Sequence, residues 1–253
     1  MLVQADCVFE YAFYMSERGC CRSKLFFQIC RNLTYKSHKN EHPLTGRSTA
    51  LDAPITAVST AENPWVVHLR IATTFGAGLL DSCVGSLINN RWVLTSGTCV
   101  QNLRFAWIRY GAVNVINPEL VTETSSSRFN NRVGLIAINR AIEFTPTISA
   151  VELAAASDEL PETGTLCGYG AQEDGSPGET LRCIEFTLSG QENDVFEGTS
   201  EGETSEFDIG APLVSNGKQI GVLVRPAENG SAALFASVGS YKVWIDFETQ
   251  SPF

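Results

Sequence analysis

The chain has 253 residues, and 43% of them are hydrophobic, which is enough for the core of one large domain or two small ones. Lys and Arg total 18 against 28 Asp and Glu, so the net charge is −10, and this excludes the basic surface that nucleic acids and anionic membranes require. No run of apolar residues is long enough to span a bilayer.

Eight cysteines beside only two methionines indicate disulfides and an oxidising, extracellular compartment. Glycosylation sequons at Asn32 and Asn229 agree with secretion. The first residues lack the basic segment and the long apolar stretch of a signal peptide, so the compartment is inferred from the cysteines and not from a targeting sequence.

Residues 1–50 differ in pattern from the rest of the chain, because they are rich in cysteine and end in a polar stretch. The four cysteines, which can pair in three ways, are Cys7, Cys20, Cys21 and Cys30. The alternative is metal binding by Cys20, Cys21, His38 and His42, although their spacing fits no common zinc pattern. We expect a disulfide-containing extension and linker, then one main domain over residues 51–253, with no metal or cofactor.

Short strands separated by turns are predicted from Pro64 onward. Residues 65–71 and 105–110 alternate in hydropathy, which is typical of strands with one buried face. Residues 135–138 and 220–224 are short apolar runs of the length of a buried strand.

A hairpin is predicted at Asn216-Gly217, because this dipeptide is typical of two-residue turns between antiparallel strands. Only residues 240–247 have helical spacing. With 21 glycines and only 18% charged residues, the repeated strands favour an all-β sandwich or barrel.

Residues 83–99 carry the most specific motif of the chain. They read Cys-Val-Gly-Ser-Leu-Ile-Asn-Asn-Arg-Trp-Val-Leu-Thr-Ser-Gly-Thr-Cys and closely resemble the segment with the catalytic histidine in chymotrypsin/trypsin-like serine proteases. Four more segments stand in that family's order: residues 64–67 resemble its first strand, 131–136 the strand with the catalytic aspartate, 208–214 the nucleophile loop, and 238–245 the closing helix. The resemblance covers residues 64–247.

The resemblance implies an all-β fold of two antiparallel six-stranded barrels with a cleft between them. The first barrel would cover about residues 64–148, the second about 149–240, and a C-terminal helix about 240–248. Two disulfides are implied as well: Cys83 with Cys99 beside the catalytic histidine position, and Cys167 with Cys183 if their strands form the family's hairpin.

The three catalytic positions of the family have lost their reactive groups. Acyl transfer needs a serine nucleophile, a histidine base and a buried aspartate. Thr98 stands at the histidine position and is no base near neutral pH. Arg132 brings a permanent cation to the aspartate position, and Ile209 puts a hydrocarbon at the nucleophile position. We expect these positions to meet at the cleft, with Arg132 extending into the space of the missing imidazole. His68, outside these motifs, is expected to be a satisfied histidine on a strand.

The substrate-binding edge is altered too. Val224, Arg225 and Pro226 stand where the family has Ser-Trp-Gly, and proline has no N–H to donate to a peptide. Ser205 replaces a cysteine whose disulfide braces the specificity pocket in the family. Residues 192–206 hold six acidic residues and no basic one, which indicates a solvated loop or, alternatively, an acidic contact surface.

Activation in this family follows a cleavage that frees an apolar amino terminus, which then pairs with the aspartate before the nucleophile. That aspartate is kept as Asp208, but no clear activation sequence precedes Trp65. Arg47-Ser48 and residues 55–58 are the closest matches. We expect Asp208 to accept hydrogen bonds from backbone N–H groups of its own turn.

These features predict a non-catalytic homologue, of a kind found especially in invertebrates, that acts as a secreted binding, adaptor or regulatory protein. The expected partners are proteins, such as active proteases, their zymogens or their substrates. Two alternatives remain: an active serine endopeptidase with a rearranged catalytic site, and a structural or storage protein of a secretion.

Overall fold

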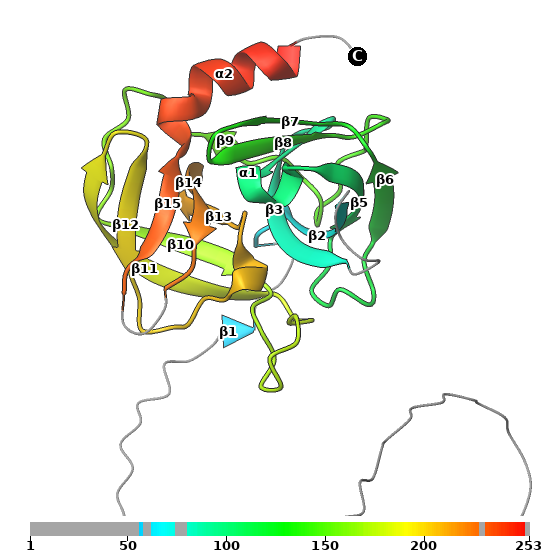
Figure 1. The fold of residues 1–253 in the computed structure, drawn as a ribbon, viewed down its shortest axis with the longest axis horizontal. Helices are drawn as coiled ribbons and strands as arrows, with labels where there is room; N and C mark the ends of the chain where they lie inside the picture. Colours follow the sequence, from blue (N-terminus) through cyan, green and yellow to red (C-terminus); the bar gives the residue numbers. More distant parts are fainter. Residues whose placement is uncertain (1–55, 58–61, 74–79, 228–230, 251–253) are drawn as a thin grey trace, which may run out of the picture. The chain divides into compact units, whose positions relative to one another are not determined.

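Strands make up most of the described chain, as Figure 1 shows. The computed structural model describes residues 56–57, 62–73, 80–227 and 231–250. The predicted extension over residues 1–50, its cysteines and both sequons (Asn32 and Asn229) lie outside these residues. The strands form two sheets, one of seven strands and one of eight, and the all-β prediction is confirmed.

The first sheet runs in the order β6-β5-β2-β3-β4-β8-β7 and is antiparallel throughout. Its strands are β2 (Val66–Thr73), β3 (Asp81–Asn89), β4 (Trp92–Ser96), β5 (Leu103–Tyr110), β6 (Leu120–Thr124), β7 (Ser127–Asn130) and β8 (Val133–Ala137). We predicted six strands. The seventh arises because Ser125 and Ser126 interrupt one strand, whose first half pairs with β5 and whose second half pairs with β8. This bent strand joins the two edges of the sheet and gives the barrel.

The second sheet contains a ring of six strands, β11-β10-β13-β14-β15-β12, closed by the pairing of β12 with β11. They are β10 (Thr163–Gly168), β11 (Arg182–Glu192), β12 (Val195–Thr199), β13 (Pro212–Ser215), β14 (Lys218–Arg225) and β15 (Ala233–Ser237). Two short strands extend the predicted six: β1 (Thr56–Ala57) on β11, and β9 (Glu152–Leu153), which pairs in parallel with β14.

The hairpin between β13 and β14 turns at Asn216 and Gly217, as predicted. Both residues have positive φ, 50° and 78°, in agreement with a two-residue turn of the kind that glycine and asparagine favour. Ser215 and Lys218 are directly opposite each other on either side of the turn.

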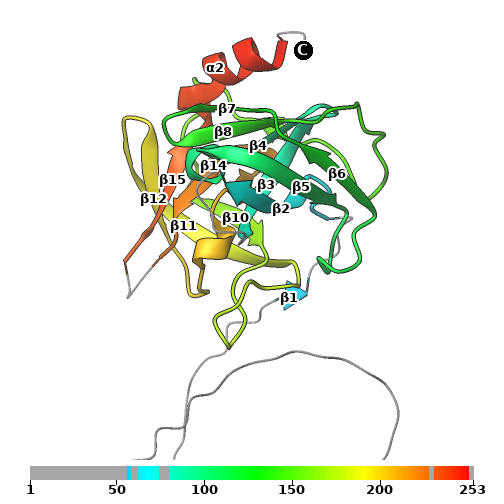
Figure 2. The ribbon, with the colours of Figure 1, turned by 45° about the vertical axis from the view of Figure 1, so that its right-hand side comes forward.

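The helices are short, apart from the last. The first is α1 (Gly97–Val100), which follows β4 at once, and the last is α2 (Val238–Gln250). α2 is longer than the helix predicted at about 240–248. It begins directly after β15 at Val238, which is fully buried. Figures 1 and 2 show α2 beside β7, where Arg128 and Glu248 form an ion pair of 3.6 Å. Within the described residues, no helix is long and apolar enough to cross a membrane.

One hydrophobic cluster joins both barrels to α2. It contains Leu94 and Leu135 of the first sheet, Val222 of the second, and Tyr241 and Ile245 of the helix. Since the removal of such side chains from water drives folding, this shared core fixes the two barrels against each other. The loops between them are thereby brought to one place, where the candidate site lies.

Candidate functional site

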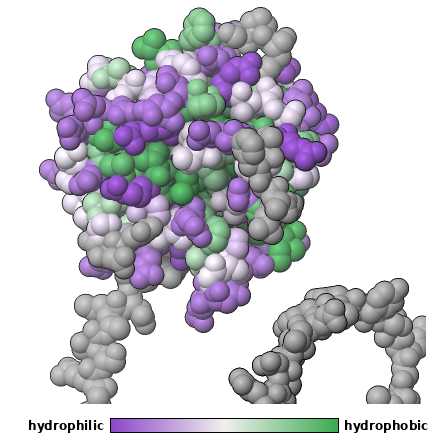
Figure 3. All heavy atoms as spheres, in the orientation of Figure 1, coloured by the Kyte–Doolittle hydropathy of each residue, from purple (hydrophilic) through white to green (hydrophobic). Residues whose placement is uncertain are grey.

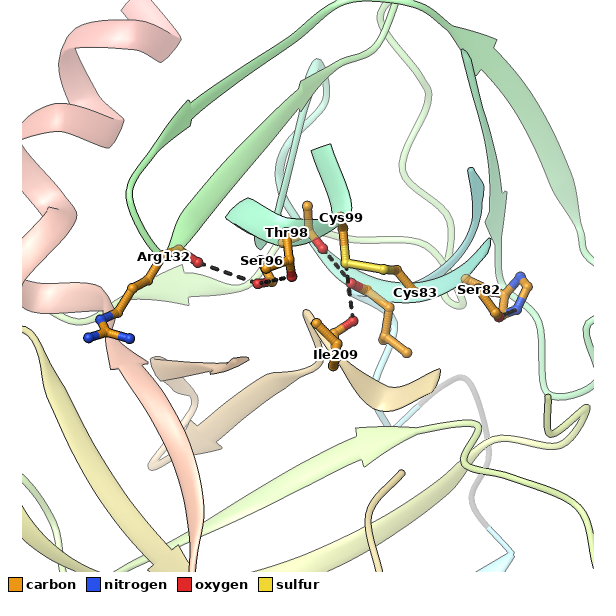
Figure 4. Close-up of a disulfide and its surroundings, with 10 residues drawn as sticks. Ser82, Cys83, Ser96, Thr98, Cys99, Arg132 and Ile209 are labelled. Atoms are coloured by element: carbon orange, nitrogen blue, oxygen red, sulfur yellow. Dashed lines mark hydrogen bonds between the residues drawn. A yellow bond between two sulfur atoms is a disulfide. The ribbon is translucent and has the colours of Figure 1, made fainter. Parts of the chain in front are cut away.

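A disulfide links β3 to α1 at the edge of the site (Figure 4). Cys83 and Cys99 are bonded with an S–S distance of 2.04 Å, and both are buried. A second disulfide joins Cys167 and Cys183, which are direct partners in the β10–β11 ladder. Both pairs implied by the resemblance are therefore present.

Thr98, Arg132 and Ile209 come from three different elements; Figure 4 shows Thr98 and Ile209 beside this disulfide and Arg132 on the other side of Ser96. Thr98 lies in α1 and Arg132 lies directly before β8; the N–H of Gly97 donates to the carbonyl of Arg132 over 2.8 Å. Ile209 follows the 3-10 helix η1 (Glu206–Asp208), and its carbonyl oxygen lies 3.6 Å from Sγ of Cys99. The backbone brings the three positions together, although none carries a catalytic group.

The hydroxyl of Thr98 has a local partner. It shares a hydrogen bond of 2.9 Å with the hydroxyl of Ser96, whose Oγ lies 3.5 Å from the carbonyl oxygen of Arg132. Two neutral hydroxyls thus bond to each other here, and neither is a base near neutral pH.

Arg132 does not fill the space of the missing imidazole, and this prediction is wrong. Figure 4 shows its side chain pointing away from Thr98 and Ile209. Its Nε lies 3.5 Å from a carboxylate oxygen of Asp194, which therefore draws the guanidinium out of the cleft. Asp194 also accepts a hydrogen bond from the hydroxyl of Tyr241, whose pKa is raised to about 12 by burial and by this hydrogen bond to the carboxylate. Tyr241 therefore stays protonated and remains a donor.

Ile209 is held by both its side chain and its backbone. The side chain packs against the core of the first barrel. The N–H donates to the carbonyl oxygen of Glu206 over 3.3 Å and ends η1. In an active serine protease the N–H of the nucleophile residue binds the oxyanion of the transition state. Here that N–H already has a partner inside the loop.

The carboxylate of Asp208 is only 2% exposed and accepts hydrogen bonds from its surroundings. Oδ1 accepts from the N–H of Gly170 over 2.7 Å, and Oδ2 accepts from the N–H and hydroxyl of Ser205 over 2.9 and 3.1 Å. The expected bond from a backbone N–H of its own turn is thus present at Ser205, and the N–H of Gly170 adds one from another loop. A cation that the sequence reasoning missed, Arg182, lies 3.8 Å from Oδ2. The pairing of Cys183 with Cys167 would have revealed it, because the same register puts Arg182 opposite Gly168.

The altered substrate edge is closed against the neighbouring loop. Strand β14 ends at Arg225, which is exposed, and Pro226 is buried. The next residue, Ala227, donates its N–H to Oγ1 of Thr204 over 3.0 Å. The end of this strand is therefore hydrogen-bonded to the loop that leads into η1.

His68, the only histidine of the described residues, lies on β2 and is 2% exposed. Its Nδ1 lies 3.2 Å from Nη1 of Arg109, and its Nε2 lies 2.9 Å from the hydroxyl of Ser82. Because a guanidinium can only donate, Nδ1 must accept, and the ring proton is on Nε2. Burial, and then the charges of Arg109 and Arg70, lower the pKa of His68 to about 3. The ring is neutral and donates to Ser82, so it cannot remove the proton of that hydroxyl.

An open cavity of about 320 Å³ lies between the disulfide and η1. Its lining combines hydrocarbon, hydroxyl and carboxylate groups and includes Leu80, Asp81, Thr98, Glu206, Phe207 and Ile209. Two of the three degenerate catalytic positions therefore face a common space. On the face of the molecule shown in Figure 3, hydrophobic residues gather toward the middle and hydrophilic residues surround them.

Two β-barrels, a cleft disulfide and a closing helix define the class of chymotrypsin-like proteins. The family model described as Trypsin matches residues 55–245, and the chain belongs to this family of serine endopeptidases.

Relatives of known identity agree with this assignment. Chymotrypsin-2 of Vespa crabro is 27% identical over 209 residues, which cover 72% of this chain and 92% of the wasp protein. Among solved structures, HL collagenase has a TM-score of 0.67 at 23% identity, covering 78% of this chain and 97% of the collagenase. The scabies mite inactivated protease paralogue S-I1 has a TM-score of 0.68 at 19% identity, covering 77% and 99% of the two chains. The two structures share the fold.

Proposed function

We propose that this protein is a non-catalytic serine protease homologue that acts outside the cell as a binding, adaptor or regulatory protein. The observation that carries the proposal is the set of side chains at the three catalytic positions. Thr98 bonds to Ser96, Arg132 turns to Asp194, and Ile209 packs into the first barrel. Ile209 has no nucleophilic atom, and neither Thr98 nor Arg132 can remove a proton from a nucleophile near neutral pH.

The backbone around Ile209 supports the same proposal. The N–H of Ile209 is bonded to Glu206, and Ala227 at the end of β14 is bonded to Thr204. Stabilisation of an oxyanion requires donors that are free and oriented before the reaction, so the bonded N–H of Ile209 is a poor oxyanion donor. Pro226 removes a further donor to a substrate backbone.

The alternative of a rearranged active site finds no support in the described residues. It would need a base next to a nucleophile, and the pair that comes nearest is His68 with Ser82. His68 donates to Ser82 instead of accepting from it, and Ser82 is 7% exposed. The name of the scabies mite paralogue, an inactivated protease, also indicates that this fold persists without catalysis.

The cavity beside Thr98 and Ile209 is the place where we propose that a protein partner binds. It offers apolar surface from Leu80 and Phe207 and two carboxylates, Asp81 and Glu206. An apolar or basic side chain of the partner would fit this combination. Secretion of the protein agrees with the two disulfides found in the described residues, because disulfides are typical of oxidising compartments.

The catalytic part of the proposal is tested with a fluorophosphonate, which labels an activated serine, and with a panel of chromogenic peptides. We expect neither labelling nor turnover, with active trypsin as the positive control. Stoichiometric labelling would establish the active-enzyme alternative.

The binding part is tested by capture of partners from the secreted fluid that contains the protein. Ile209→Arg fills the cavity with a charged side chain and should abolish capture. Val243→Arg is the matched control, because Val243 lies on α2 and is 79% exposed. Equal loss with both variants, or no specific capture by the unaltered protein, would favour a structural or storage role.

A further inference from the structure

The charge balance around Asp208 leads to an inference that is independent of the proposed function. A carboxylate that is 2% exposed has lost nearly all of its contact with water. Such a buried charge is strongly destabilising unless an opposite charge and hydrogen bonds replace the water. The conformation of the loop that carries Asp208 therefore depends on which group provides the opposite charge.

The described residues provide that charge from within the domain. Nη2 of Arg182 lies 3.8 Å from Oδ2 of Asp208 and donates to the carbonyl oxygen of Glu203 over 3.3 Å. The guanidinium thus contacts both the carboxylate and the backbone of the segment that leads into η1. With a side chain 21% exposed, Arg182 is itself largely shielded from water.

Two glycines make room for this pair. A Cβ on Gly170 would lie 1.8 Å from Nη2 of Arg182, and φ of Gly170 is +67°. A Cβ on Gly168 would lie 2.3 Å from Oδ1 of Asp208. The guanidinium and the carboxylate therefore occupy space that any other residue at these positions would take.

The remaining bonds of Asp208 are local too. Ser205 and Asp208 form a reciprocal capping box at η1. Oγ of Ser205 accepts from the N–H of Phe207, and Oδ2 of Asp208 accepts from the N–H of Ser205. The N–H of Gly170 completes the set. In the described residues, every partner of the Asp208 carboxylate thus comes from residues 170–205 of the second barrel and its loops.

We infer that Arg182 is the internal counter-ion of Asp208, so that the loop over residues 203–211 takes its conformation in the uncleaved chain. A free amino terminus is not needed to neutralise Asp208. The loop is then already in this conformation in the chain as synthesised, and proteolytic cleavage upstream of the domain does not change it.

Hydrogen exchange in the full chain tests the inference directly. The amides of Gly170 and Ser205 report on the loop, because both donate to the carboxylate of Asp208. The chain is given a specific protease site that ends at residue 54, so that cleavage frees Ile55, and exchange is measured before and after cleavage. We expect the two amides to be protected in the uncleaved chain and to change by less than about twofold on cleavage. Protection that appears only after cleavage would overturn the inference.

Substitution of Arg182 tests the counter-ion itself. Arg182→Gln should accelerate exchange at Gly170 and Ser205 by about tenfold or more, because it leaves a buried carboxylate unpaired. Arg182→Lys should restore part of the protection, and the exposed Arg104→Gln is the matched control. Unchanged exchange in Arg182→Gln would contradict the assignment.

A double variant keeps the test decisive if Arg182→Gln folds poorly. Arg182→Gln combined with Asp208→Asn removes both charges, and removal of a buried pair is far less harmful than removal of one partner. The double variant should therefore melt at a higher temperature than Arg182→Gln alone. A double variant no more stable than the single one would show that Arg182 does not neutralise Asp208.

Discussion

The two walls of the cleft, one from each barrel, match the family's active-site pattern to different degrees. On the first-barrel wall the frame is intact: the Cys83–Cys99 disulfide is formed, and the N–H of Gly97 donates to Arg132 over 2.8 Å. Only the side chains at Thr98 and Arg132 are changed. On the second-barrel wall backbone groups are affected as well, because the N–H of Ile209 is bonded within η1 and Pro226, which has no N–H, directly follows β14.

The difference follows from what holds each wall. The first wall is built from core residues: Cys83, Cys99 and Val100 are buried in the hydrophobic cluster of the first barrel. Since a core loses stability with each misplaced side chain, folding alone is enough to fix this frame, whatever side chains stand at Thr98 and Arg132. The loop of the second wall carries Ser205 in place of a bracing cysteine, and polar bonds hold it instead.

The largest expected effect tests whether the second-barrel wall prevents activity even when the three catalytic side chains are restored. In the triple variant Thr98→His, Arg132→Asp, Ile209→Ser, we expect kcat/KM for chromogenic peptides at least ~10⁴-fold below that of an active family member. The restored triad would still lack free oxyanion donors and a substrate edge. The measurement is steady-state turnover together with titration by a fluorophosphonate.

The control for the triad is the double variant Thr98→His, Arg132→Asp, which keeps Ile209. Turnover by the triple variant should not exceed that of this control. Robust turnover would mean that the two walls differ less than the structure indicates, and that only side chains were lost.

The disulfides sharpen the comparison in terms of stability. Replacing Cys83 and Cys99 by serine should lower the free energy of unfolding by about 3 kcal/mol, because the bond closes a loop with a sequence separation of 16. Cys167 and Cys183 have the same separation, so their replacement should cost a similar amount. Urea denaturation measures both. A loss below about 1 kcal/mol for one pair would show that loop closure does not describe that barrel.

The pH dependence of stability tests the burial of His68 in the first barrel. Its pKa is about 3 in the folded protein against an ordinary 6.5, so the unfolded chain binds a proton at a pH where the folded chain does not. Its contribution is complete above pH 6.5 and is lost progressively as the pH falls toward 3. Between pH 6.5 and pH 5 the loss should be about 2 kcal/mol.

His68→Gln is the reference for this titration, because glutamine cannot take up a proton. The free energy of unfolding, measured by urea at several pH values, should fall less steeply for this variant than for the unaltered protein. Parallel curves would show that His68 is not buried in the neutral form.

The smallest effect is expected for the ion pair that takes Arg132 out of the cleft. Arg132 and Asp194 have side chains 39% and 30% exposed, and pairs of this exposure contribute about 0.2–1 kcal/mol. A double-mutant cycle with Arg132→Gln and Asp194→Asn should give a coupling energy in that range. A coupling energy above 2 kcal/mol would instead indicate that the pair is a main support of the second wall.

The sequence predicted the backbone of the site better than its side chains. The family resemblance of residues 83–99 implied the first disulfide, which is present, whereas the short helix α1 that carries Thr98 and Cys99 was not predicted. The direction of Arg132 was not predictable from its own motif. It depends on Asp194, which lies in an acidic segment without a motif and reaches Arg132 only through the fold.

The position of Arg182 could have been predicted from the register of β10 and β11. Arg182 directly precedes a cysteine that the sequence paired correctly, and strand alternation from that pair leads to Gly168 and Asp208. The count of strands differed for a different reason: β6 and β7 are two halves of one bent strand, and β1 and β9 have two residues each. Elements this short carry no recognisable hydropathy pattern.

The closed sheets determine how another protein can attach to this one. In the second barrel, β12 pairs with β15 on one side and with β11 on the other, so the ring has no long free edge. In the described part of the chain, the strands added outside that ring are β1 and β9, and two residues offer too few backbone groups to extend a sheet. A partner that recognises this barrel must therefore contact side chains and loops and not add a strand to the sheet. The affinity of such a complex will depend on point substitutions at the surface of this barrel more than on the backbone conformation of the partner.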